Sequence, residues 1–183
     1  MRQDFAFVAE RTLASHSPAL VRSGPADVDL LAGLGRSAQR LVRSLRGGLA
    51  RMCGGDTPEV KIDPPREMTG DDVIQPGQCL YSLFALAPAQ TRMVSVIEAE
   101  TLLRLVDRAF GGPGEAPRPI PRELPMSADM MAQRVEAVLA AELAPMLPGA
   151  HAINPLRRDG DWREILPWPT EARVVMVTIA VTE

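Results

Sequence analysis

The sequence predicts an α/β fold in which two long helices and about six strands pack as helix layers over one sheet. Two apolar stripes with helical spacing, several strand-sized apolar runs and a weak internal repeat lead to this prediction. With 183 residues, 46% of them apolar, the chain has the size of one domain with extra segments and can bury a core. We expect residues 1–26 to form a flexible N-terminal arm, because Pro18, Gly24 and Pro25 interrupt a segment without periodicity.

Two long helices are predicted, one over Asp27–Met52 and one from its N-cap Ser127 to Pro145, which should end or bend it. In each, apolar residues recur every three or four positions and make one buried stripe. The first stripe is Leu31, Leu34, Ala38, Leu41, Leu45, Leu49 and Met52, and the second is Met131, Val135, Val138, Leu139, Leu143 and Met146. The arginines off the first stripe form a face that either is solvated or meets an acidic partner: Arg36, Arg40, Arg43 and Arg51.

Short apolar runs predict strands at 59–63, 79–87 and 92–99, and one or two more between 150 and 165. A strand that is apolar on both faces, and therefore interior, closes the chain at 173–182. A short helix is predicted at 100–110, stopped by Gly111-Gly112, with an apolar side made of Leu102, Leu103, Val106 and Phe110. Five prolines between 113 and 125 predict a stiff, extended connector.

The internal repeat relates the two long helices. At an offset of 94 positions, the segment 38–41 (Ala-Gln-Arg-Leu) aligns with 132–135 (Ala-Gln-Arg-Val). The same offset places Leu45, Leu49 and Met52 on Leu139, Leu143 and Met146. The repeat predicts two similar halves that the connector at 113–125 joins.

Composition argues against several classes of function. The net charge is −3 and no long basic run exists, so we expect no nucleic-acid partner. The apolar runs are strand-sized and charges interrupt the N-terminal segment, so we expect neither a membrane span nor a signal peptide. Cys53 and Cys79 stand far apart and His16 and His151 do not cluster, so we expect reduced thiols in a cytosol, no metal site and no cofactor.

Residues 105–114 resemble a motif of the flagellar motor switch protein FliM family. The chain reads Leu-Val-Asp-Arg-Ala-Phe-Gly-Gly-Pro-Gly, and the family carries Leu-Val-Asp-Arg-Phe-Phe followed by Gly-Gly-x-Gly, so Ala109 is the departure. Residues 122–127 and Gln133-Arg134-Val135 are similar to the entry and the middle of the family's second long helix. The resemblance covers roughly residues 30 to 183.

The resemblance implies a pseudo-symmetric three-layer α/β/α sandwich over residues 27–183 that catalyses nothing. It implies a structural component of the motor switch complex (the C-ring), located in the cytoplasm at the inner-membrane face of the flagellar basal body. Such a component takes part in chemotaxis by transmitting the signal that sets the direction of rotation. Its partners would be FliG and neighbouring FliM copies.

The resemblance also assigns the FliG contact to particular residues. The contact falls on Gly111, Gly112, Pro113 and Gly114, with Arg108, Phe110 and Arg122 as neighbours. Glycines let a partner approach the main chain closely, and Pro113 stiffens the loop before binding. Gly111 taken alone can equally be a helix terminator. We expect Gly112→Lys to lower the affinity for FliG and to leave the fold intact.

Departures from the family limit what the resemblance implies. The family's acidic N-terminal segment, which captures phosphorylated CheY, is not found in residues 1–20. The sequence, which ends at Glu183, contains no FliN-like C-terminal domain. The chain would therefore be a fragment or a shortened variant, and these departures argue against contacts with CheY and FliN.

Two alternative functions stay open. The fold is similar to that of CheC/CheX-type phosphatases, which makes hydrolysis of phosphorylated CheY the alternative function. Their motif, Ser/Asp-x-x-x-Glu-x-x-Asn, is met neither from Ser37 nor from Ser127. A free-standing interaction domain with an unrelated partner is the third class, and it predicts a buried or dispensable glycine loop.

Overall fold

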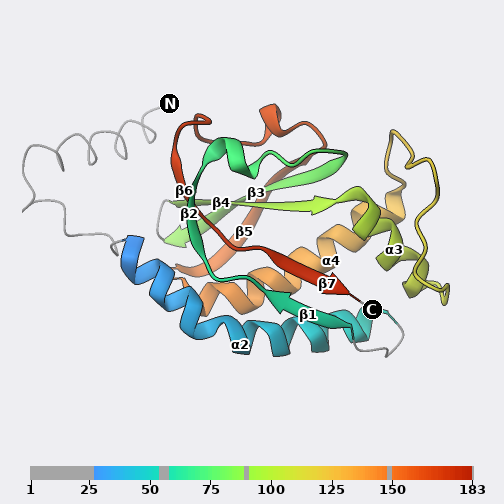
Figure 1. Cartoon of the computed structure of the whole chain (residues 1–183), viewed down its shortest axis with the longest axis horizontal. Helices are drawn as coiled ribbons and strands as arrows, with labels where there is room; N and C mark the ends of the chain where they lie inside the picture. The colour runs from blue at the N-terminus through green and yellow to red at the C-terminus, as the bar shows by residue number, and fades with distance from the viewer. Residues whose placement is uncertain (1–26, 54–57, 89–90, 148–149, 183) are drawn as a thin grey trace, which may run out of the picture.

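The structure is a computed structural model that describes residues 27–53, 58–88, 91–147 and 150–182. The predicted arm at 1–26 lies outside the described residues. The long helices of the described part are α2 (Asp27–Met52) and α4 (Met126–Leu143), and a shorter helix is α3 (Ala99–Ala109). In Figure 1, α2 runs along the lower edge of the molecule with α4 alongside it, and α3 with the connector forms one end of the molecule. The chain is therefore α/β, as predicted.

The central sheet has three antiparallel strands in the order β4-β3-β5. They are β3 (Cys79–Pro88), β4 (Thr91–Glu98) and β5 (Ala150–Asp159), which confirms the strands predicted in these regions. Side chains alternate between the two faces of β3. Phe84 and Leu86 pack with Ala144 on the face toward α4, whereas Tyr81 packs with Ile165 on the opposite face.

Among the described residues, the remaining strands form two separate two-stranded ladders, so the single sheet of about six strands is wrong in this detail. Strand β1 (Glu59–Ile62) pairs with β7 (Ile179–Thr182), and β2 (Arg66–Thr69) pairs with β6 (Arg173–Met176). The three-layer sandwich stays a prediction that these ladders do not confirm.

The predicted interior strand at 173–182 is also wrong, because it is two short strands with one partner each among the described residues. The segment that pairs with these two strands explains the break between them. Ile62 pairs with Ile179 and Arg66 with Met176, so the segment between β1 and β2 faces the break between β6 and β7. That segment holds Pro64-Pro65, which have no N–H to continue the ladder.

The apolar stripe of α2 is buried as predicted. Leu41, Leu45 and Leu49 form a core cluster with Val60 of β1, and side chains of α4 pack on it. The two helices approach closely at Gly48, where an added Cβ would lie 2.8 Å from Cγ1 of Val138. The predicted arginine face is exposed at Arg36, Arg40, Arg43 and Arg51. None of the described helices has an apolar stretch long enough to cross a membrane.

Helix α4 begins two residues earlier than predicted. Pro125, with φ −65° and ψ 156°, is the N-cap, and its carbonyl accepts hydrogen bonds from the N–H groups of Ala128 (2.9 Å) and Asp129 (3.3 Å). Ser127 is therefore inside the first turn and does not cap it, since a proline fixes a φ that suits the start of a helix without a donor. The predicted end is confirmed, because α4 stops at Leu143 and a 3-10 turn containing Pro145 follows.

The connector at 113–125 has no helix or strand, as predicted, but it packs on the domain. Ala116, Ile120 and Leu124 lie against the core cluster that α3 and α4 share. Nε2 of Gln78 donates to the carbonyls of Pro121 (3.0 Å) and Arg122 (2.9 Å), which ties the connector to the residue before β3. The connector therefore reinforces the end of the molecule where α3 lies.

Candidate partner-binding site

The candidate site begins where α3 ends. Leu102 and Leu103 are buried, and the helix stops at Ala109 with Phe110 as its C-cap. The N–H of Gly111 donates to the carbonyl of Arg108 (2.9 Å), and that of Gly112 donates to the carbonyl of Asp107 (2.8 Å). This pair of bonds is the Schellman motif, which needs a left-handed residue after the cap. Gly111 has φ +84°, so its role as a helix terminator is confirmed.

A second anchor closes the loop from its far side. Oδ2 of Asp107 accepts hydrogen bonds from the N–H of Gly114 (2.8 Å) and of Glu115 (3.0 Å). Gly114 is buried and has φ +91°, a backbone angle that residues with a side chain rarely adopt. The sequence contained Asp107 within the quoted motif, but its role was missed because nothing in the spacing shows that the carboxylate turns toward the loop.

The remaining loop residues differ in exposure. Phe110 is 82% exposed, Gly111 and Pro113 are exposed, and Gly112 is half-buried. The prediction that Phe110 belongs to the apolar side of the helix is wrong, because the chain leaves the helix at that residue. We call residues 110–114 the glycine corner. It presents one aromatic ring, one proline ring and bare main chain.

The two predicted arginine neighbours differ in how they relate to the glycine corner. Arg108 is half-buried in the last turn of α3, and its carbonyl takes part in the cap. Arg122 is exposed in the connector, where its carbonyl accepts from Gln78. The structure therefore joins Gly112 and Gly114 through Asp107 and Gly111 through the carbonyl of Arg108, and it leaves Arg122 outside that set of contacts.

That Gly112→Lys leaves the fold intact stays a prediction, and the structure adds a local consequence. A Cβ at Gly112 would overlap the carboxylate of Asp107. The carboxylate would have to move away and would release the amides of Gly114 and Glu115. This substitution would change the shape of the corner as well as its charge.

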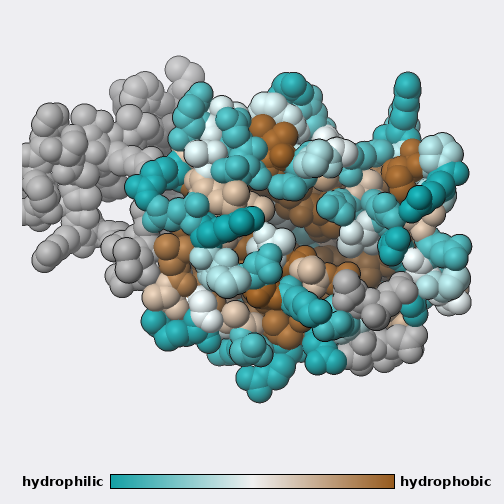
Figure 2. Space-filling view, in the orientation of Figure 1, coloured by the Kyte–Doolittle hydropathy of each residue, from teal (hydrophilic) through white to brown (hydrophobic). Residues whose placement is uncertain are grey.

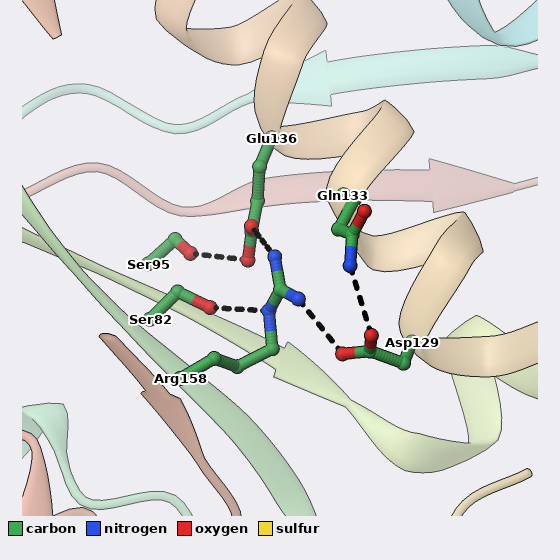
Figure 3. Close-up of polar contacts among 6 residues, drawn as sticks. All are labelled: Ser82, Ser95, Asp129, Gln133, Glu136 and Arg158. Atoms are coloured by element: carbon green, nitrogen blue, oxygen red, sulfur yellow. Dashed lines mark hydrogen bonds and ion pairs between the residues drawn. The ribbon is translucent and has the colours of Figure 1, made fainter. Parts of the chain in front are cut away.

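A buried polar cluster under α4 was missed by sequence reasoning (Figure 3). Arg158 of β5 pairs with Glu136 and with Asp129 of α4, the latter at 2.7 Å between Nη1 and Oδ1. Its Nε donates to Oγ of Ser82 at 3.0 Å, and Oγ of Ser95 donates to Glu136 at 3.3 Å. Glu136 is only 3% exposed. The signal was present, since Glu136 continues the row of Ala128 and Ala132, both fully buried.

Electrostatics favours the charged form of Arg158 in this cluster. Burial by itself lowers the pKa of Arg158, but the hydrogen bonds and charges of Glu136 and then Asp129 outweigh burial and raise the pKa above its ordinary value. The pairs are therefore ionic, and they fasten α4 to all three strands of the central sheet.

The cluster also bears on the phosphatase alternative. Asp129, Gln133 and Glu136 have the spacing of the phosphatase motif, with the acid and the amide exchanged, and the sequence comparison from Ser127 missed them. In the structure, Nε2 of Gln133 donates to Asp129 at 2.9 Å, and both acids hold Arg158. Glu136 is thus engaged in the interior, where it holds the helix on the sheet.

Two hollows of the surface lie away from the glycine corner. One of about 410 Å³ lies between the end of α4 and the start of β5, beside His151, and one of about 490 Å³ lies at β2 and β6, beside Asp72. Neither includes a residue of the glycine corner. Within residues 27–53, 58–88, 91–147 and 150–182, no group of three or more His, Cys, Asp or Glu could hold a metal ion.

Comparison with known proteins gives a consistent fold. No protein-family model and no curated protein sequence matches the chain. A chain of the FliG–FliM complex from H. pylori matches with a TM-score of 0.73 and 15% identity, over 86% of this chain and 88% of that one. The FliM middle domain from Vibrio alginolyticus matches with a TM-score of 0.66 and 16% identity, over 84% of each chain. Thermotoga maritima FliY matches with a TM-score of 0.61 and 16% identity, over 84% of this chain and 83% of that one. At these identities the likeness is one of fold, and the chain has the fold of a FliM middle domain.

Proposed function

We propose that the chain is a non-catalytic component of a flagellar motor switch that binds FliG through the glycine corner. Two observations support this function. The fold is that of FliM middle domains, one of which is known in a complex with FliG. The single observation that favours the corner as the contact is Phe110, a large apolar side chain that is 82% exposed beside bare main chain.

The chemistry of the corner suits a protein partner. An aromatic side chain buries roughly 150–250 Å² when it enters a pocket, and such residues dominate interface energetics. Pro113 and the cap of Gly111 hold the main chain in one conformation, so little conformational entropy is lost on binding. On the face drawn in Figure 2, hydrophobic patches are interspersed with hydrophilic residues.

The proposal extends to the motion that the switch makes. Neighbouring copies would pack side by side in a C-ring in the cytoplasm, below the inner membrane, and a tilt passed between them would set the direction of rotation. The domain spans residues 27–183 with two similar halves. The close contact between α2 and α4 and the shared core of α3 and α4 favour a rigid unit, because packed interiors transmit displacement.

The test is the affinity for FliG of the same organism, measured by calorimetry for the wild-type chain and for Phe110→Ala. Loss of an aromatic anchor costs about 2 kcal/mol or more, so we expect the dissociation constant to rise about thirtyfold or more. Leu156→Ala is the matched control, since Leu156 is an apolar side chain 52% exposed on β5. We expect this control to bind like the wild type.

Circular dichroism of each variant monitors the fold, which neither truncation should change because both side chains are exposed. Equal affinities of Phe110→Ala and the wild type would contradict the assignment of the corner. A wild-type chain that does not bind FliG would contradict the proposed function itself and favour an unrelated partner.

A further inference from the structure

The hydrogen-bond donors of the glycine corner are all used inside the chain. The N–H of Phe110 donates to the carbonyls of Val106 and Asp107, both at 3.1 Å, and the N–H of Gly111 donates to that of Arg108. Gly112 donates to the carbonyl of Asp107. Pro113 has no N–H, and Gly114 donates to the Asp107 carboxylate, as does Glu115 just beyond the corner.

The main-chain carbonyl oxygens of the corner, in contrast, are not used among the described residues. Within the described part of the chain, the carbonyl oxygens of residues 110–113 accept no hydrogen bond. Each carbonyl can accept up to two. A partner that lies on the corner therefore meets free acceptors, two rings and glycine surface, but no free main-chain donor.

Asp107 accepts hydrogen bonds from most of these main-chain donors. Its carbonyl holds the amides of Phe110 and Gly112, and its carboxylate holds those of Gly114 and Glu115. A carboxylate that accepts two amide bonds holds a turn more strongly than a neutral acceptor does. Since these bonds lie within nine residues of each other, Asp107 fixes the local shape without any contact across the domain.

We infer that Asp107 is the positioning residue of the binding site, and that it makes the glycine corner an acceptor-only surface. The partner surface that fits combines an apolar pocket for Phe110 with hydrogen-bond donors such as Arg, Asn, Gln or His side chains. An acidic partner group would find no main-chain donor here. This inference rests on the proposed function, because it takes FliG as the partner.

The experiment uses Asp107→Ala and Asp107→Asn in the whole chain. Asparagine keeps an acceptor oxygen within reach of both amides, whereas alanine removes it. The first readout is amide hydrogen exchange of Gly114 and Glu115 in the free chain, which needs no partner. We expect exchange to quicken at least about tenfold in Asp107→Ala and much less in Asp107→Asn.

The second readout is the affinity for FliG. We expect it to fall at least about fivefold in Asp107→Ala and to recover in Asp107→Asn, a rescue that mere removal of bulk would not predict. On titration of the wild type with FliG, the carbonyl ¹³C resonances of residues 110–113 should move in the direction of hydrogen-bond acceptance.

Unchanged exchange in Asp107→Ala would overturn the positioning role, and so would faster exchange with unchanged affinity. Unmoved carbonyl resonances in a complex that forms would overturn the acceptor-only interface. No binding by the wild type, with exchange quickened in Asp107→Ala, would instead refute the proposed function while leaving the anchor of the corner in place.

Discussion

Asp107 and Glu136 are two carboxylates of neighbouring helices that hold different kinds of structure. Asp107 is half-buried and binds amides that follow it closely in the sequence, at Gly114 and Glu115. Glu136 is buried and binds Arg158, which in turn binds Ser82 in another strand. The first carboxylate shapes a surface, whereas the second fixes the packing of a helix on a sheet. Changes at Asp107 should therefore alter binding more than stability, and changes at the Arg158 cluster should do the reverse.

The largest effect is expected for Arg158→Ala. This change leaves Glu136 buried without its partner, and breaking a buried ion pair in this way costs about 3–5 kcal/mol. Urea unfolding measures the free energy. Arg157→Ala is the matched control, because Arg157 pairs with Glu164 at 2.8 Å in an exposed position and its loss should cost less than about 1 kcal/mol. Equal losses of unfolding free energy in the two variants would contradict the claim that the buried cluster stabilises the fold more than a surface ion pair does.

A smaller effect, carried by packing alone, is expected at two adjacent glycines of α2. In Gly48→Ala, the new methyl group would lie 2.8 Å from Cγ1 of Val138, so we expect a loss of about 1–3 kcal/mol from overpacking. In Gly47→Ala the nearest atom is Nη1 of Arg51 at 3.7 Å, so the higher helix propensity of alanine should stabilise the chain by up to about 1 kcal/mol. Thermal unfolding of both variants checks the opposite signs. Two changes of the same sign would mean that α2 and α4 are not in close contact at this point.

A third carboxylate, Asp72, extends the comparison to an exposed cap, where the smallest effect is expected. Oδ2 of Asp72 accepts from the N–H and then from the hydroxyl of Thr69, both at 2.8 Å, and these bonds lower its pKa below the ordinary value of 3.8. Because the folded pKa is the lower one, the contribution to stability is fully present above the unfolded value and is lost as the pH falls through the folded value. Unfolding between about pH 2 and pH 5 should therefore depend on pH less steeply in Asp72→Asn than in the wild type. Identical slopes would show that the cap does not couple to folding.

The sequence predicted those parts of the fold that the spacing of apolar residues and the positions of helix-breaking residues determine. The bounds of α2, the strand of residues 79–87 and the stop at Pro145 follow from apolar spacing and from residues that break helices. The glycine loop was found through its motif, and the role of Gly111 through its place after a helix.

The rest depends on contacts between distant residues. The division of 173–182 into two strands is caused by Pro64-Pro65 in the segment that faces it. These prolines are more than 100 positions away in the sequence. Arg158 and Glu136 are paired through the packing of β5 on α4, and one sequence does not specify which buried acid an arginine meets. The exposure of Phe110 follows from where α3 stops, and the terminal residue of a helix is among the least reliable features of a sequence-based prediction.

The central claim is that the glycine corner is the surface that a FliG partner covers. Backbone amide resonances of the whole chain, followed while FliG is added, test it most directly. We predict that the largest shift changes occur at residues 107–115, with small changes at Arg158 and along α2. Changes centred on α2 or on the three-stranded sheet, with the resonances of 107–115 unmoved in a saturated complex, would contradict it.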